Sequence, residues 1–343
     1  MAAPTSKQLK PNRGIADSRL RCNAVLVLAL SLVFSHHQLA AQANDSALIF
    51  AVVGDVPYGD KALAQFPELV ASIEASAAEF VIHLGDIKGG SASCSDEMIA
   101  SRIQAIDAIK KPTVYIPGDN DWTDCHRRRA GRFSPLERLG FLRQQAFKVT
   151  GQSLGQPFLA VESQASQAGF EEFPEHQRWT QNNTAFIALH VLGSANGFEG
   201  FSGRTQADDA EAVRRIEASI AWLRSSMELA INTNVAAIVV AIHGNPFALS
   251  PSRAARYDMH PYAALLAQLK QQSVKFGKPV LLIHGDTHSY KFDQPFTEIG
   301  SDAVLTNLYR LEGIGDPAIG WVETSVDSNS SQGFSVIPHY ISR

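Results

Sequence analysis

Five apolar runs along this chain each end in a short motif built on aspartate or histidine. The runs cover residues 48–53, 80–84, 113–117, 237–242 and 279–283, and the motifs are Gly54-Asp55, Gly85-Asp86, Gly118-Asp119-Asn120-Asp121, His243-Gly244-Asn245 and His284-Gly285-Asp286-Thr287-His288. Such runs, rich in β-branched residues, are typical of strands buried on both faces. We therefore expect the motif side chains to meet at one edge of one sheet. Carboxylates and imidazoles gathered there are badly solvated unless a positive charge lies between them, so the pattern predicts a metal centre.

Helical patterns separate the strands in the first third of the chain, which predicts βαβ units and a parallel sheet with right-handed crossovers. Helices are expected over residues 61–78 and 96–109, after Ser134-Pro135, and over residues 213–227 and 261–275. Beyond His288, short apolar runs joined by turns favour a more antiparallel end. These patterns predict one α/β domain, residues 44–343.

Residues 1–43 have the pattern of a secretory signal peptide. Five basic residues precede an apolar core from Ala24 to Phe34, and the small-residue site Ala41-Gln42-Ala43 predicts cleavage after Ala43. The core is shorter than the roughly 20 residues that span a bilayer. We expect an exported protein, periplasmic or secreted, with no stable membrane span after cleavage; an uncleaved N-terminal anchor is the alternative.

The predicted mature chain is acidic. Removing the leader takes away five basic residues and one acidic residue, which leaves 25 basic and 33 acidic residues and a net charge of −8. A surface that binds nucleic acid in general carries a positive charge, because it must neutralise phosphates. The charge therefore argues against general nucleic-acid binding, although it leaves room for a local basic pocket.

Two cysteines remain after the leader, Cys94 and Cys125, and each follows a motif aspartate. An even pair in an exported protein favours a disulfide, which would tie two of the motif loops together. Two unpaired buried thiols are the alternative. Zinc binding is disfavoured because the chain has no CxxC spacing or comparable zinc motif.

The ordered set of motifs resembles that of the calcineurin-like metallophosphoesterases, whose pattern runs Asp-x-His, Gly-Asp, Gly-Asn-His-Asp/Glu, His and Gly-His-x-His. The resemblance covers about residues 48–290. It implies a four-layer α/β/β/α sandwich with two metals at the strand ends. It also implies hydrolysis of a phosphoester by a hydroxide shared between the two metals.

The resemblance implies six metal ligands: Asp55, Asp86, Asp119, His243, Asp286 and His288. In this assignment Asp55 binds the first metal and Asp86 bridges both. Asp119 and His243 bind the second metal, and Asp286 and His288 supply one ligand to each. A slip of one residue, which would make Asn120 the ligand in place of Asp119, is left open.

This chain departs from the family pattern at several positions. Pro57 replaces the histidine of Asp-x-His, so the first metal loses a ligand unless Tyr58 or water replaces it. Asp119 and Asp286 replace an asparagine and a histidine, which makes the site richer in carboxylate. Harder ions, Mn²⁺, Mg²⁺, Ca²⁺ or iron, are then favoured over zinc. Asn120 takes the place of the catalytic histidine and can hydrogen-bond a phosphate oxygen, but it cannot protonate a leaving group.

The densest basic cluster of the mature chain follows the third motif, at Cys125-His126-Arg127-Arg128-Arg129. Arg127 and Arg128 are candidates to clamp a phosphate, and His126 is a candidate general acid. The alternative for each arginine is an ordinary solvated loop.

The leading hypothesis is a metallophosphoesterase that acts on a small phosphorylated substrate, either a monoester or a diester. One alternative is a protein on the same scaffold that binds metal or phosphate and has weakened catalysis, since Pro57 and Asn120 replace functional histidines. Another is a metal-dependent hydrolase of a different bond, or an unrelated fold in which the motifs are turns.

Overall fold

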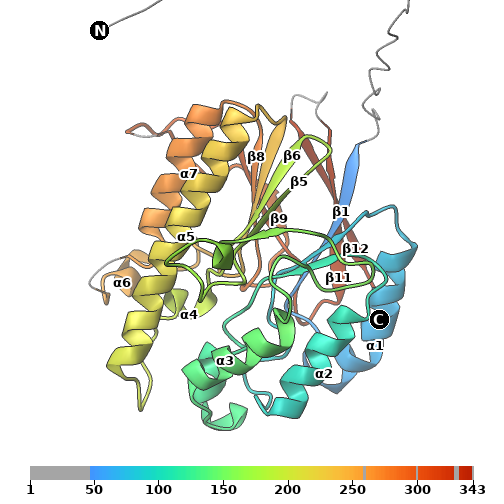
Figure 1. Cartoon of the computed structure of the whole chain (residues 1–343), viewed down its shortest axis with the longest axis vertical. Coiled ribbons are helices and arrows are strands. Elements are labelled where there is room, and N and C mark those ends of the chain that lie inside the picture. The colour runs from blue at the N-terminus through green and yellow to red at the C-terminus, as the bar shows by residue number, and fades with distance from the viewer. Residues whose placement is uncertain (1–46, 258–259, 299, 328–331, 342–343) are drawn as a thin grey trace, which may run out of the picture. The chain divides into compact units, whose positions relative to one another are not determined.

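Two β-sheets, each covered by helices on its outer face, form the folded part of the chain (Figure 1). The computed structural model describes residues 47–257, 260–298, 300–327 and 332–341. The expected leader, residues 1–43, lies outside the described residues, so the signal peptide and the boundary of the mature domain stay predictions. In the described part of the chain, no helix is long and apolar enough to cross a membrane.

The first sheet has the strand order β12-β11-β1-β2-β3. Its elements are β1 (Leu48–Val53), α1 (Gly59–Ala75), β2 (Val81–His83), α2 (Asp96–Asp107), β3 (Thr113–Tyr115), β11 (Gly320–Val326) and β12 (Phe334–Tyr340). The strands β1, β2 and β3 are parallel, which confirms the predicted βαβ order. The C-terminal strands β11 and β12 extend this sheet in antiparallel fashion, with β11 paired directly to β1.

The second sheet has the order β4-β5-β6-β7-β8-β10-β9. Its strands are β4 (Glu162–Ser163), β5 (Gln177–Gln181), β6 (Thr184–Ala188), β7 (Ala237–Ala241), β8 (Val280–His284), β9 (Lys291–Asp293) and β10 (Leu308–Glu312). The strands β6, β7, β8 and β10 are parallel, and β4, β5 and β9 add antiparallel pairs.

Helices cover the outer face of each sheet (Figure 1). The first sheet packs on α1, α2 and α3 (Pro135–Ala146), and the second packs on the long helices α5 (Gln206–Asn232) and α7 (Ala263–Phe276). Short turns complete the chain: η1 (Thr123–His126), η2 (Arg128–Ala130), η3 (Gln164–Ser166), α4 (Gly193–Asn196) and α6 (Pro251–Ala254). The helix α5 begins at a capping box, in which Thr205 and Asp208 satisfy each other's backbone N–H groups.

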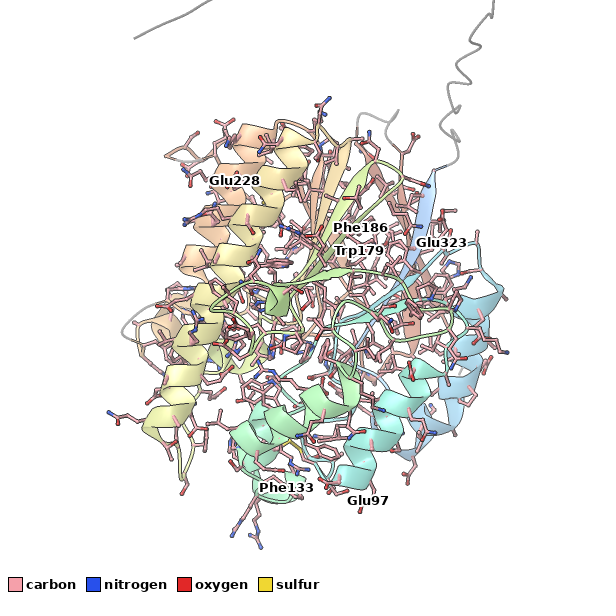
Figure 2. All side chains as sticks on the ribbon, in the orientation of Figure 1. Glu97, Phe133, Trp179, Phe186, Glu228 and Glu323 are labelled. Carbon is pink, nitrogen blue, oxygen red and sulfur yellow. A yellow bond between two sulfur atoms is a disulfide. The ribbon has the colours of Figure 1, made fainter. Side chains whose placement is uncertain are left out.

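An aromatic core fills the space between the two sheets. Phe50 and Phe80 from the first sheet stack with centroids 5.3 Å apart, and both meet Phe186 of the second sheet edge-on. Figure 2 shows Trp179 and Phe186 side by side, with ring centroids 4.9 Å apart. Helices, sheet, sheet and helices therefore follow one another, which confirms the four-layer α/β/β/α order.

The expectation that all five motifs follow strands of one sheet is wrong. The first three motifs follow β1, β2 and β3 of the first sheet, and the last two follow β7 and β8 of the second. Because the sheets are stacked, their strand ends still face a common space. The candidate centre thus lies between the two sheets.

Candidate metal centre

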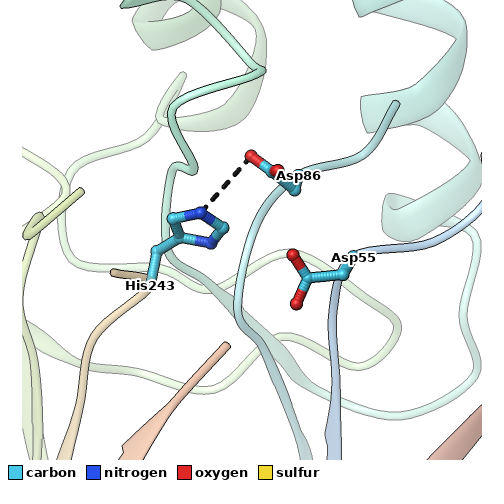
Figure 3. A group of neighbouring side chains, drawn as sticks. All are labelled: Asp55, Asp86 and His243. Atoms are coloured by element: carbon cyan, nitrogen blue, oxygen red, sulfur yellow. Dashed lines mark ion pairs between the residues drawn. The ribbon is translucent and has the colours of Figure 1, made fainter. Parts of the chain in front are cut away.

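Five of the six predicted ligands belong to two overlapping groups of buried or partly buried side chains. Oxygen and nitrogen atoms of Asp55, Asp86 and His243 lie within 4.8 Å of one another, as do those of Asp119, His243 and Asp286. His243 is common to both groups, whereas the resemblance gives the bridging position to Asp86. Figure 3 shows the first group, with Asp55 and Asp86 turned toward the same space and His243 beside Asp86.

The sixth predicted ligand, His288, lies beside the first group. Its Nε2 is 3.3 Å from Oδ1 of Asp55. The other ring nitrogen, Nδ1, lies 2.7 Å from the carbonyl of Asp316, and Nδ1 of His243 lies 2.6 Å from the carbonyl of Leu84. Histidines that ligate metals commonly donate their second N–H to a carbonyl in this way, because it directs the lone pair of the first nitrogen at the metal. Both histidines therefore have the orientation of ligands.

Four of the six predicted ligands have left-handed backbone conformations. The φ angles are 55° at Asp55, 53° at Asp86, 76° at Asp286 and 57° at His288. Residues other than glycine rarely adopt positive φ, and such conformations cluster at functional sites where the surrounding structure enforces them. In this chain they occur at the ends of strands, where Asp86, Asp286 and His288 line one cleft and Asp55 is buried beside His288.

Two buried ligand atoms form no hydrogen bond among the described residues, namely Oδ1 of Asp55 and Nε2 of His243. Each instead has an ion-pair contact, Oδ1 with Nε2 of His288 at 3.3 Å and Nε2 with Oδ1 of Asp119 at 3.4 Å. A buried polar atom without a hydrogen bond costs about 1–3 kcal/mol. The chain also leaves space beside the second group: a Cβ on Gly193 would lie 2.3 Å from Oδ1 of Asp286 and 2.7 Å from Oδ2 of Asp119. Ligand atoms without hydrogen bonds, together with the close approach of Gly193 to Asp119 and Asp286, fit divalent cations.

The electrostatics of the cluster show a shortage of positive charge. Burial and neighbouring carboxylates raise the pKa of Asp86 well above its usual range, although His243 opposes the rise. Burial and Asp119 raise the pKa of Asp286 to about 6. Burial lowers the pKa of His243, but the surrounding carboxylates outweigh it and raise the pKa well above 6.5. Each of these shifts favours added positive charge, which a proton or a metal ion supplies.

Tyr58 and Asn120 hold Asp86 in place. The Tyr58 hydroxyl donates to Oδ2 of Asp86 over 2.7 Å, and the Asn120 amide donates to that oxygen and to the Tyr58 hydroxyl. The backbone N–H of Asn120 donates to Oδ1 of Asp86 over 2.9 Å. The side chain of Asn120 thus presents its N–H₂ group to a carboxylate, and Asp119 is the residue that lies 3.4 Å from Nε2 of His243.

Asp121, which was assigned no role from the sequence, joins the second and third motifs. One of its oxygens accepts from the backbone of Asp86 and Gly118 and from the Tyr115 hydroxyl, and the other accepts from the backbone of Ile87. This carboxylate is saturated with hydrogen bonds, so it shapes the loops rather than offering a ligand. The doubled aspartate of Gly118-Asp119-Asn120-Asp121 was the signal that could have revealed it.

Ser194 and Asp124 are further residues of the cleft that the sequence did not reveal. The Ser194 hydroxyl lies 2.6 Å from Oδ2 of Asp119 and 3.1 Å from Oδ1 of Asp124. Burial and Asp119 raise the pKa of Asp124 to about 7, although Arg127, 2.5 Å away, opposes the rise. Ser194 lies in a loop of small residues with no motif, so no sequence signal pointed to it.

The basic cluster is divided between two cavities. Arg127 lines the cleft of about 350 Å³ that contains Asp86, Asp119 and Asp286. The predicted residues His126 and Arg128 do not line this cleft; they line an adjacent cavity of about 760 Å³. His126 stacks on Phe201 at 4.2 Å, and its Nδ1 lies 2.8 Å from the Thr123 carbonyl, so packing of η1 turns the ring away from the cleft.

Cys94 and Cys125 form the predicted disulfide, with Cα atoms 5.7 Å apart. Both sulfur atoms lie near the carbonyl of Asn120. The bond therefore connects the loop after β2 with η1, directly beneath the third motif. This confirms the pairing and the expected link between two site-forming loops.

Comparison with solved structures identifies the fold. A structure of PhoD is similar over 86% of this chain and 72% of that chain, with 12% identity and a TM-score of 0.52. The chain shares the fold of PhoD. The metallophosphoesterase sandwich expected from the motifs is thereby confirmed at the level of the fold.

Two other solved structures are similar over 86% of this chain. A purple acid phosphatase from yellow lupin seeds has 11% identity, a TM-score of 0.47 and 54% of its own chain covered. A phosphatase from Mycoplasma pneumoniae has 12% identity, a TM-score of 0.37 and 94% of its own chain covered. No protein-family model and no curated protein matches the sequence.

Proposed function

We propose that this protein is a metal-dependent phosphoester hydrolase with a two-metal site. The observation that supports it most is the pair of overlapping aspartate and histidine groups, which share His243 and leave two buried ligand atoms without a hydrogen bond among the described residues. The fold shared with PhoD supports the same reaction class.

The proposed ligands are the six predicted residues: Asp55, Asp86, Asp119, His243, Asp286 and His288. Four carboxylates and two imidazoles form a mostly hard donor set, which favours Mn²⁺, Mg²⁺, Ca²⁺ or iron over zinc. Two such cations, when bound, activate water for attack on phosphorus and offset the charge of the phosphoryl oxygens.

The chain's own residues prepare this chemistry. Asn120 and Tyr58 fix both oxygens of Asp86, so the carboxylate cannot rotate out of the cleft. Asp124 holds Arg127 at the cleft wall, where its guanidinium can bind an oxygen of the phosphoryl group. Ser194 orients Asp119, and the backbone N–H of Asn245 orients Asp286 over 3.1 Å.

Metal content and turnover, measured together, test this proposal. Bound metal is first removed from the mature protein with a chelator. Release of p-nitrophenol from p-nitrophenyl phosphate and from its bis-ester is then followed after Mn²⁺, Mg²⁺, Ca²⁺, Zn²⁺ or iron is added back. About two equivalents of bound metal with metal-dependent release of one ester supports the enzyme and sets its class as monoesterase or diesterase. Absence of bound metal would overturn the proposal.

The arrangement of Asn120 and His126 favours a second candidate function, a protein that binds metal or phosphate on the same scaffold with weakened catalysis. The Asn120 amide is already engaged by Asp86 and Tyr58, and His126 lies outside the cleft. The groups expected to bind the phosphate oxygen and to protonate the leaving group are therefore both committed elsewhere. Bound metal without turnover of any phosphoester would support this function.

Export to an oxidising compartment is proposed on two grounds. The Cys94–Cys125 disulfide persists in such compartments, and residues 1–43 have a signal-peptide pattern. Determination of the N-terminal residue of the protein from the exported fraction tests it, with Asn44 as the expected result.

A further inference from the structure

The cavity beside the metal cleft carries a positive charge that the proposed reaction does not use. We name it the arginine cavity; it holds about 760 Å³, and Arg127, Arg128 and Arg132 line it together with His126, Phe133 and Phe201. Arg127 also lines the metal cleft, so the two spaces meet at this side chain.

Two of the three arginine charges in the arginine cavity are free to meet a ligand. Arg127 is paired with Asp124, but neither Arg128 nor Arg132 forms an ion pair with another residue in the described part of the chain. The acidic residue in the lining, Asp208, accepts from the backbone N–H and the hydroxyl of Thr205 in the cap of α5. Its carboxylate caps the helix and brings one negative charge, whereas Arg128 and Arg132 bring two unpaired positive charges, so the cavity keeps a net positive charge.

The metal cleft has the opposite character. Five carboxylates line it, from Asp86, Asp119, Asp124, Glu199 and Asp286. An acidic cleft that takes cations and then a phosphoryl group therefore lies next to a larger basic cavity. A ligand whose only phosphate lies in the metal cleft would leave Arg128 and Arg132 without an anionic partner.

We propose that the arginine cavity binds a second phosphate on the part of the substrate that is not hydrolysed at the metals. The inference rests on the proposed phosphoesterase function and narrows its substrate class to organic bisphosphates. Guanidinium groups bind phosphate bidentately, which makes them selective for such a group. The carbon skeleton between the two phosphates would pass Arg127 and contact Phe201 and Phe133 (labelled in Figure 2).

A matched pair of substrates tests this inference. Phosphate release is measured from a nucleoside 3′,5′-bisphosphate and from the corresponding 5′-monophosphate, with the metal that supports turnover. The wild type is expected to favour the bisphosphate by about tenfold or more in kcat/KM, the scale of one charge-assisted contact. Arg132→Ala should remove most of that preference, and high salt should weaken it.

Arg129 provides the control. It lies in the same basic run, but it does not line the arginine cavity, so Arg129→Ala should keep the wild-type preference. If Arg129→Ala and Arg132→Ala lost the preference for the bisphosphate equally, general surface charge would explain the preference and the inference would be overturned. A wild type that hydrolyses both substrates with equal kcat/KM would also overturn it.

Binding separates this inference from the proposed function. Titration calorimetry of wild type, Arg132→Ala and Arg129→Ala with the bisphosphate needs no turnover. About tenfold weaker binding to Arg132→Ala than to the other two supports the cavity even if no ester is hydrolysed, in which case the hydrolase proposal fails alone. Equal affinity of all three proteins for the bisphosphate would overturn the proposed phosphate site, whether or not the protein is an active enzyme.

Discussion

Two clusters of buried polar side chains lie near each other and differ in how their hydrogen bonds are satisfied. In the metal cluster, Oδ1 of Asp55 and Nε2 of His243 have no hydrogen-bond partner in the described part of the chain. In the second cluster, which we name the Glu175 cluster, Arg143 and His190 both bond the carboxylate of Glu175.

The histidines of the Glu175 cluster have their hydrogen bonds satisfied within the protein. Nε2 of His190 accepts from the Trp122 indole over 3.1 Å, so both ring nitrogens have partners. His176, next in the chain to Glu175, likewise lies between Gln164 and Ser219. Although burial acts to raise the pKa of Glu175, Arg143 and His190 hold it well below its usual range. The charge of Glu175 is therefore balanced by residues of the protein, and the cluster needs no ligand.

The difference between the clusters separates structure from function. Burial of charge is costly in both, because each group loses its water. In the Glu175 cluster, hydrogen bonds and ion pairs within the protein offset that cost. In the metal cluster part of the cost is not offset by the protein, and a bound cation would offset it. Trp122 follows the third motif directly, so one segment serves both clusters.

The largest effect is expected from Asp86→Asn. Loss of this carboxylate removes a central ligand from the metal cluster, so turnover should fall by about a thousandfold or more and bound metal should be lost. Metal analysis and steady-state kinetics measure both. Asp60→Asn, exposed in the first turn of α1, is the control. Full activity in Asp86→Asn would mean that the metal cluster is only structural.

Glu175→Gln is expected to act on stability instead. Removing one partner of a buried ion pair costs about 3–5 kcal/mol, because Arg143 is left with an uncompensated charge. Urea unfolding measures this cost, and metal content of the folded variant should stay at the wild-type value. Glu172→Gln, whose partner Arg214 is partly exposed, should cost less than about 1 kcal/mol. Similar losses in both variants would contradict the comparison.

The Glu175 cluster should also lose stability in acid through His176. Burial lowers the pKa of His176 to about 3. Between pH 6.5 and that value, the unfolded chain binds a proton at His176 and the folded chain does not. Stability should therefore fall as the pH falls, by up to ~1.4 kcal/mol per pH unit from this residue.

Unfolding free energies at several pH values measure this slope. His176→Gln is expected to be less stable at pH 7 and to show a shallower decline between pH 6.5 and pH 4.5, since it has no proton to bind. Parallel declines in variant and wild type would assign the acid sensitivity to other residues.

The smallest effect is expected from Gly193→Ala. A methyl group there would press on the carboxylates of Asp119 and Asp286, so metal should bind about tenfold more weakly with little change in the Glu175 cluster. Metal titration followed by calorimetry measures the change. Gly200→Ala, whose new methyl would meet no atom of the described residues within 4 Å, is the control. Unchanged affinity in Gly193→Ala would show that the space beside Gly193 is not needed for metal.

The sequence predicted the strands, the βαβ order and the disulfide because their signals are local. An apolar β-branched run, a following helix and an even cysteine count can each be recognised without knowing what packs where. The directions of side chains on loops depend on distant partners. His126 belongs to the basic run but stacks on Phe201, and Asn120 turns its amide to Tyr58 and Asp86.

By itself, the sequence determined that aspartates and histidines would gather at strand ends, since a polar residue after a buried strand lies at the sheet edge. Tertiary structure decided that two stacked sheets, not one, supply them. The reason is long-range pairing: the C-terminal β11 pairs with β1 in the first sheet, whereas β7 and β8 pair with β6 and β10 in the second. The same packing divides the basic run between the metal cleft and the arginine cavity, because η1 and the Phe201 loop meet only in the folded chain.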